Sequence, residues 1–102
     1  MVSSNTLRFT QDNSQSNRQE IEHLTTEFQA RYAGRTVAIT HEIREGIALL
    51  GIYLIPLTDD RSGNAPNYML GVVEVPINAN VRIDTILNKL DPLMEELQDR
   101  ER

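Results

Sequence analysis

The sequence has no cysteine among its 102 residues. A chain without thiols can form neither a disulfide framework nor a zinc–thiolate site, so the fold has to be held by an apolar core. A chain of this length forms one domain and buries enough surface to fold without such cross-links.

Positive charge is scarce as well. Ten basic residues stand against fifteen acidic ones, and the formal net charge is -5. This balance argues against a protein that grips nucleic-acid phosphates. The longest apolar run is far shorter than the roughly 20 residues of a membrane span, and no basic stretch precedes an apolar one at the N-terminus. We therefore expect a soluble, cytoplasmic chain with no membrane contact.

The most apolar part of the chain is Gly46 to Leu57, which reads GIALLGIYLIPL and has no charged residue. Its odd and even positions are equally apolar. Successive side chains of a strand point to opposite faces, so both faces of this segment need cover. Its β-branched residues, its length and the proline near its end favour a central strand over a buried helix.

Two further strands are predicted beside this one. Residues 35–43 alternate between apolar and polar side chains, and the glycine of the connection Arg44-Glu45-Gly46 suits a hairpin turn. Residues 68–75 form a third apolar run, closed by Pro76. Because short connections make sequential strands neighbours, we expect an antiparallel meander in chain order.

Helices are predicted on both sides of these strands. Ser16 to Gln19 fits a capping box, and Gly34 suits the end of the helix that follows. Apolar residues recur there at helical spacing: Ile21, Leu24, Phe28 and Tyr32. Asn78 or Asn80 is expected to cap a second helix with a broader apolar stripe: Val81, Ile83, Ile86, Leu87, Leu90, Met94 and Leu97. Pro92 predicts a kink or break near residues 90–92.

The predicted fold is therefore α+β, in the order α-β-β-β-α, with both helices on one face of the sheet. Residues 17–98 are expected to form the domain, with a charged, frayed tail at residues 99–102 and a flexible, polar N-terminal arm at residues 1–16. As an alternative, residues 6–10 form a short edge strand in which Leu7 and Phe9 share one face.

Two families share features with this order of elements. It is the order of double-stranded RNA-binding domains, but the matching start of the second helix reads NANVRIDT and lacks their basic cluster. Size, acidity and element order also resemble small secretion-chaperone-like domains. That resemblance implies a dimer that holds extended client segments.

The polar segment 58–66, TDDRSGNAP, is the longest break in the predicted domain. Loops carried on a rigid sheet often hold function, so we predict a partner-binding loop there with Asp59, Asp60, Arg61 and Asn64 as contact residues. A plain solvated loop is the alternative. The calcium-loop pattern is absent, so no metal is expected.

The sequence offers little for catalysis. The titratable groups on the predicted apolar faces are His41, Tyr53, Tyr68 and Glu74, and they lack the spacing of a nucleophile and its base. We therefore expect a non-catalytic interaction protein without a cofactor, such as an adaptor, a chaperone-like subunit or an inhibitor. A small enzyme or small-molecule binder with a cleft between subunits is the second interpretation, and nucleic-acid binding is the third.

One face of the predicted sheet remains uncovered. Whether the odd-numbered or the even-numbered residues of the central strand lie on this face, large apolar side chains would be exposed to solvent. A contiguous apolar patch of several such residues predicts association with a second copy. The dimer face is assigned to Leu50, Ile52, Leu54, Leu70 and Val72. As the alternative, the N-terminal arm covers the open face through Leu7 and Phe9.

Overall fold

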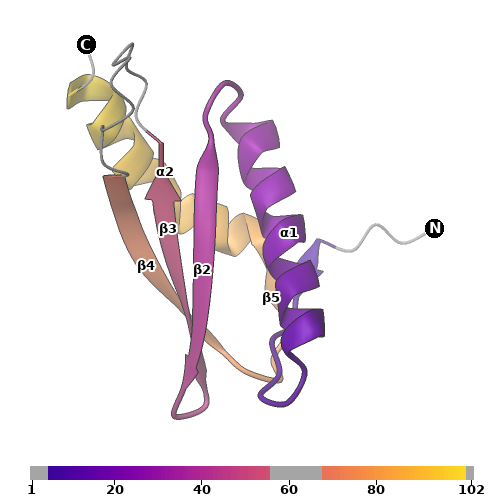
Figure 1. Cartoon of the computed structure of the whole chain (residues 1–102). Coiled ribbons are helices and arrows are strands. Elements are labelled where there is room, and N and C mark those ends of the chain that lie inside the picture. Colours follow the sequence, from indigo (N-terminus) through magenta and orange to yellow (C-terminus); the bar gives the residue numbers. More distant parts are fainter. Residues whose placement is uncertain (1–4, 56–67, 101–102) are drawn as a thin grey trace, which may run out of the picture.

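A three-stranded antiparallel meander forms the centre of the structure (Figure 1). The structure is a computed structural model that describes residues 5–55 and 68–100. The meander consists of β2 (Val37–Arg44), β3 (Ile47–Leu54) and β4 (Tyr68–Pro76) in that order. The helices are α1 (Ser14–Arg31) and α2 (Ile83–Arg100). The α+β prediction and the strand order are therefore confirmed.

A two-residue turn joins β2 to β3 and sets their register. Glu45 and Gly46 have positive φ angles of 52° and 78°, which suit a tight hairpin turn. Arg44 consequently pairs with Ile47, and Ile39 pairs with Ile52. The apolar side of β2 is thereby placed on the same face of the sheet as the even-numbered residues of β3.

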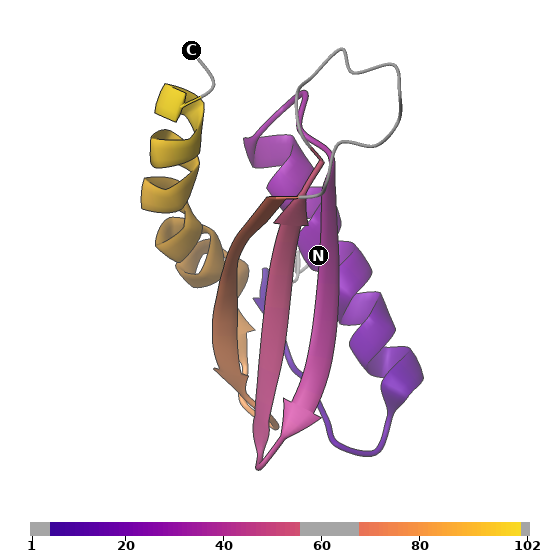
Figure 2. The same ribbon diagram turned by 60° about the vertical axis from the view of Figure 1, so that its left-hand side comes forward.

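Both helices cover this even-numbered face of β3. Figure 2 shows α1 along β2 and α2 along β4. The core joins Phe28 of α1 and Leu90 of α2 to the covered residues of β3, which have no exposed surface: Ala48, Leu50, Ile52 and Leu54. The predicted apolar stripes of both helices pack against the sheet, and most of their residues are buried.

The N-terminal segment is part of this core. Leu7 and Phe9 are fully buried, and β1 (Thr6–Leu7) pairs with β5 (Val81–Arg82). The Asn78 N–H donates to the Phe9 carbonyl at 2.7 Å. The prediction of a flexible arm is thus wrong for residues 5–16. The alternative cover for the open face is wrong too, because Phe9 packs beside His41 on the helix side. Only the short strand at Thr6–Leu7 remains of the edge-strand alternative.

Asn17 fastens this segment to α1. Its side-chain oxygen accepts from the Thr10 N–H at 2.9 Å, and its side-chain nitrogen donates to the Thr10 carbonyl at 2.7 Å. The helix begins at Ser14, ahead of the predicted capping box, because Asn13 caps it by accepting from the Ser16 N–H at 2.9 Å. Asn17, a helix residue with little surface exposed, is therefore used in a tertiary contact.

Helix α2 begins at Ile83, later than predicted, because residues 81–82 pair as β5. It runs without a break through Pro92 to Arg100, so of the predicted kink or break only the kink is left, and the frayed state predicted for residues 99 and 100 is wrong. Figures 1 and 2 show that the helix bends along its length. A proline inside a helix removes one backbone hydrogen bond and bends the helix in this way.

Candidate interaction surface

The face of the sheet that turns away from the helices, called the open face below, is lined by alternate residues of all three strands. In each row across the sheet, β2 comes first, β3 second and β4 third. From one end to the other the rows are Arg44, Ile47 and Pro76; Glu42, Leu49 and Glu74; Thr40, Gly51 and Val72; and Ala38, Tyr53 and Met69.

The predicted dimer face is mostly on the other side. Leu50, Ile52 and Leu54 have no exposed surface, and Leu70 is 7% exposed, because the helices pack on them. The assignment of these four residues to a dimer face is therefore wrong. Val72, the fifth, is 51% exposed and lies on the open face.

Polarity divides the open face into two ends. One end carries the apolar patch, defined here as Tyr53, Ile55, Met69 and Val72. Ile55 is 44% and Met69 is 47% exposed. The other end carries Glu42, Arg44 and Glu74, and Arg44 Nη2 lies 2.7 Å from Glu42 Oε1. The open face is consequently less apolar than the sequence predicted.

Gly51 lies in the middle of the open face and is nevertheless buried. A Cβ atom at this position would lie 2.7 Å from Thr40 Oγ1 and 3.1 Å from Tyr53 Cε1. The Tyr53 ring therefore folds back along its own strand and covers the glycine. Beside it is a depression of about 360 Å³, lined in part by Thr40, Leu49 and Met69.

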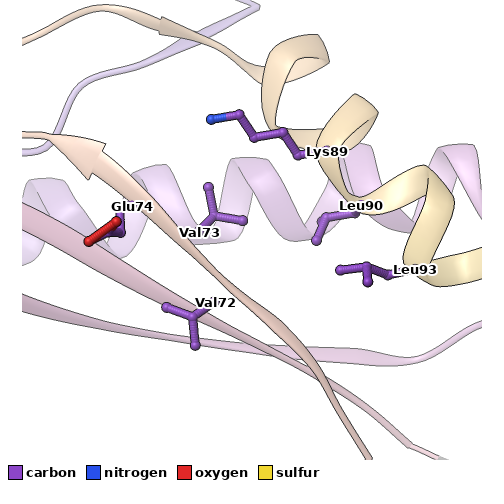
Figure 3. A pocket seen from close by; sticks show the side chains of 6 residues that line it. All are labelled: Val72, Val73, Glu74, Lys89, Leu90 and Leu93. Atoms are coloured by element: carbon purple, nitrogen blue, oxygen red, sulfur yellow. The ribbon is translucent and has the colours of Figure 1, made fainter.

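A second groove, of about 330 Å³, separates β4 from α2 (Figure 3). Leu93 of α2 is 37% exposed, and its Cδ1 lies 3.1 Å from the point that a Cβ on Gly71 would occupy. The glycine thus lets α2 approach β4 closely. Val72 lines this groove as well as the depression on the open face. Val72 and Leu93 thus place exposed apolar side chains on both sides of this groove, which Glu74 and Lys89 also line.

The other predicted site residues are not brought together. Asp59, Asp60, Arg61 and Asn64 of the predicted partner-binding loop lie outside the described residues. The His41 ring lies 6.5 Å from that of Phe9 on the helix side, whereas Tyr53 and Glu74 belong to the open face. Residues 5–55 and 68–100 contain no cluster that could ligate a metal, and neither described helix has the length and apolar composition of a membrane span.

A polar cluster between the helices was not predicted. The Tyr32 hydroxyl donates to Asp91, and Arg31 Nη1 donates to Asp91 at 3.3 Å and to Asn88 at 3.1 Å. These contacts tie the end of α1 to the middle of α2. Their partners are 57 to 60 residues apart, so no local sequence pattern signals them.

Fold and surface together define a two-layer α+β domain in which, among residues 5–55 and 68–100, both helices lie on the same face of the sheet. Comparisons of the chain with protein-family models, with curated proteins and with solved structures find no match.

Proposed function

We propose that the chain is a small, non-catalytic protein-interaction module, such as an adaptor, a chaperone-like subunit or an inhibitor, that acts as a homodimer with the apolar patch of its sheet at the contact. The apolar patch supports this proposal. Ile55, Met69 and Val72 are 44% to 51% exposed, and β-strand register places Met69 and Val72 beside Tyr53 and Gly51. Contiguous apolar surface of this kind marks interaction sites on soluble proteins.

The size of the surface bounds the expected affinity. Three strands about 4.8 Å apart, each with eight residues that rise about 3.3 Å, give a footprint of roughly 380 Å². A standard interface takes about 800 Å² from each partner. The charged end reduces the apolar share further. We therefore expect a reversible dimer with a dissociation constant in the micromolar range rather than an obligate one.

The other two interpretations have less support. The nucleic-acid interpretation keeps the order of elements, but the first turn of α2 carries Asp84 in place of basic residues. The small-molecule interpretation rests on the depression beside Tyr53, whose volume of about 360 Å³ falls at the low end of ligand pockets. A ligand would need a second protein surface to enclose it there.

Sedimentation velocity across micromolar concentrations tests the homodimer. We expect the native chain to dimerise and the Val72→Glu variant to remain monomeric, since a carboxylate would then replace an exposed apolar side chain at the contact between the two copies. Gln19→Glu, on the exposed side of α1, adds the same charge and should leave the dimer intact. A native chain that stays monomeric throughout this range contradicts the proposal.

A further inference from the structure

Exposed apolar side chains gather along the border of β4. In the described part of the chain the large hydrophobic residues with the most exposure are Ile55, Met69, Val72 and Leu93. Met69 and Val72 belong to β4, and Leu93 faces it from α2. Within residues 5–55 and 68–100, β4 has β3 as its single strand neighbour. An unpaired strand border with apolar side chains on both sides is a ready site for another strand.

The hairpin turn shows which backbone groups of β4 point outward. Arg44 and Ile47 close a two-residue turn, so they form a hydrogen-bonded pair. The alternation along β3 then directs the backbone groups of Leu50 toward its partner Val73 on β4. Val72 and Glu74 consequently direct their N–H and C=O groups to the free border. Pro76 follows at an outward position, where the missing N–H breaks no bond of the meander.

We infer that a second copy of the chain pairs with this border in antiparallel fashion, so that two meanders join into one continuous sheet. The inference rests on the proposed homodimer. With Val73 opposite the second copy's Val73, each Val72 lies opposite a Glu74 and exchanges two backbone hydrogen bonds with it. The register in which Glu74 faces the second copy's Glu74 is disfavoured, because it sets like charges directly opposite each other.

Charge also favours this arrangement over stacking of the two open faces. Stacking would bury Glu42, Arg44 and Glu74 of both copies, and desolvation of such groups is costly. Border pairing leaves their side chains on a solvent-facing surface. The border of β2 is a poorer site, because the side chains beside it on the open face are Thr40, Glu42 and Arg44, and charged residues protect a strand border.

The symmetry places the two copies of α2 on the same side of the joined sheet. A twofold axis normal to the sheet reverses the direction of the helix, so the two copies run antiparallel beside each other. Leu93 of each copy then faces the other helix and loses its exposed surface. The apolar patches of the two open faces also become neighbours, and together they offer a partner protein about twice the surface of one chain.

Single cysteines test this geometry, since the native chain has none to interfere. Val72→Cys and Thr40→Cys are matched variants, because both positions are exposed on the open face. In the joined sheet the two Val72 positions are diagonal neighbours about 7–8 Å apart, within reach of a short bismaleimide. The two Thr40 positions are separated by five strand spacings, about 24 Å. In stacked faces, about 10 Å apart, Thr40 also lies in the interface, so Thr40→Cys comes within reach of the cross-linker as well.

We expect the cross-linker to give a covalent dimer with Val72→Cys and no covalent dimer with Thr40→Cys. A dimer that cross-links through Thr40→Cys, or one that does not cross-link through Val72→Cys, overturns border pairing and leaves the homodimer standing. A chain that is monomeric at all concentrations overturns both proposals.

Proline at position 74 provides a second test. Glu74→Pro removes an outward N–H that the meander does not use, and should raise the dimer dissociation constant by about tenfold or more. Glu74→Thr keeps the N–H and removes the same charge, and should dimerise like the native chain. Equal dissociation constants for the two folded variants contradict border pairing. If Glu74→Pro fails to fold, the cross-linking result decides.

Discussion

Replacement of Phe9 by alanine tests whether the N-terminal segment belongs to the core. Phe9 has no exposed surface, its ring lies 6.5 Å from that of His41, and its carbonyl accepts a 2.7 Å bond from Asn78. Truncation of a buried phenylalanine to alanine costs about 3–5 kcal/mol, because apolar contacts are lost and a cavity is left. A domain of this length has a free energy of unfolding of about 5–15 kcal/mol. The variant should therefore lose a large part of its stability.

Urea unfolding followed by circular dichroism measures this loss. Ile55→Ala is the control, because Ile55 is 44% exposed and its truncation should change the free energy of unfolding by less than about 1 kcal/mol. Both variants should be compared at concentrations where the chain is monomeric, so that dimer formation does not contribute. A Phe9→Ala variant within about 0.5 kcal/mol of the native chain would refute the packing described here and restore the flexible arm.

Substitutions at three further contacts test the packing. Asn17→Ala should lower the free energy of unfolding by about 1–3 kcal/mol in the same urea assay, because it leaves the half-buried N–H and C=O groups of Thr10 unpaired; a loss as small as that of an exposed helix residue would contradict the contact. Gly51→Ala should destabilise the sheet, since the new Cβ would meet Thr40 Oγ1 at 2.7 Å, and Thr40→Ala should relieve part of that loss; strictly additive effects on the melting temperature would exclude the clash. Tyr32→Phe and Asp91→Ala should show a favourable coupling energy of up to about 1 kcal/mol in a double-mutant cycle, because Asp91 is 41% exposed, and a zero coupling energy would contradict a stabilising hydrogen bond.

Local patterns in the sequence were sufficient for the order of the two helices and the three strands of the meander, but not for β1 and β5. The run Gly46–Leu57 is apolar at both odd and even positions, and this pattern indicated the central strand of the sheet, the position that β3 has. The stripe of α2 is apolar at helical spacing, so its role as a main cover of the sheet could be predicted as well. Each of these inferences uses residues close together in the chain, where spacing alone fixes which side chains share a face.

The sequence contains enough information to identify which face of the sheet is open. Both parities of β3 are apolar, so β3 alone cannot distinguish them. The alternation of β2 distinguishes the two faces once the turn is known to contain two residues. Arg44 then pairs with Ile47, and Ile39 lies beside Ile52. A turn one residue longer would have shifted the register and exchanged the two faces.

The sequence by itself determined the α+β class, the central strand and the meander, because periodicity and turn residues act over a few positions. The tertiary structure decided the rest. It placed Leu7 and Phe9 in the core, used Asn17 to hold them, and left Met69, Val72 and Leu93 exposed along one strand border. These outcomes depend on contacts between residues far apart in the chain. Which side chains are buried is decided by the elements that pack against each other in the folded domain. No local pattern carries that information, because Leu7 and Leu93 look equally apolar until the packing of the helices covers one and leaves the other partly in water.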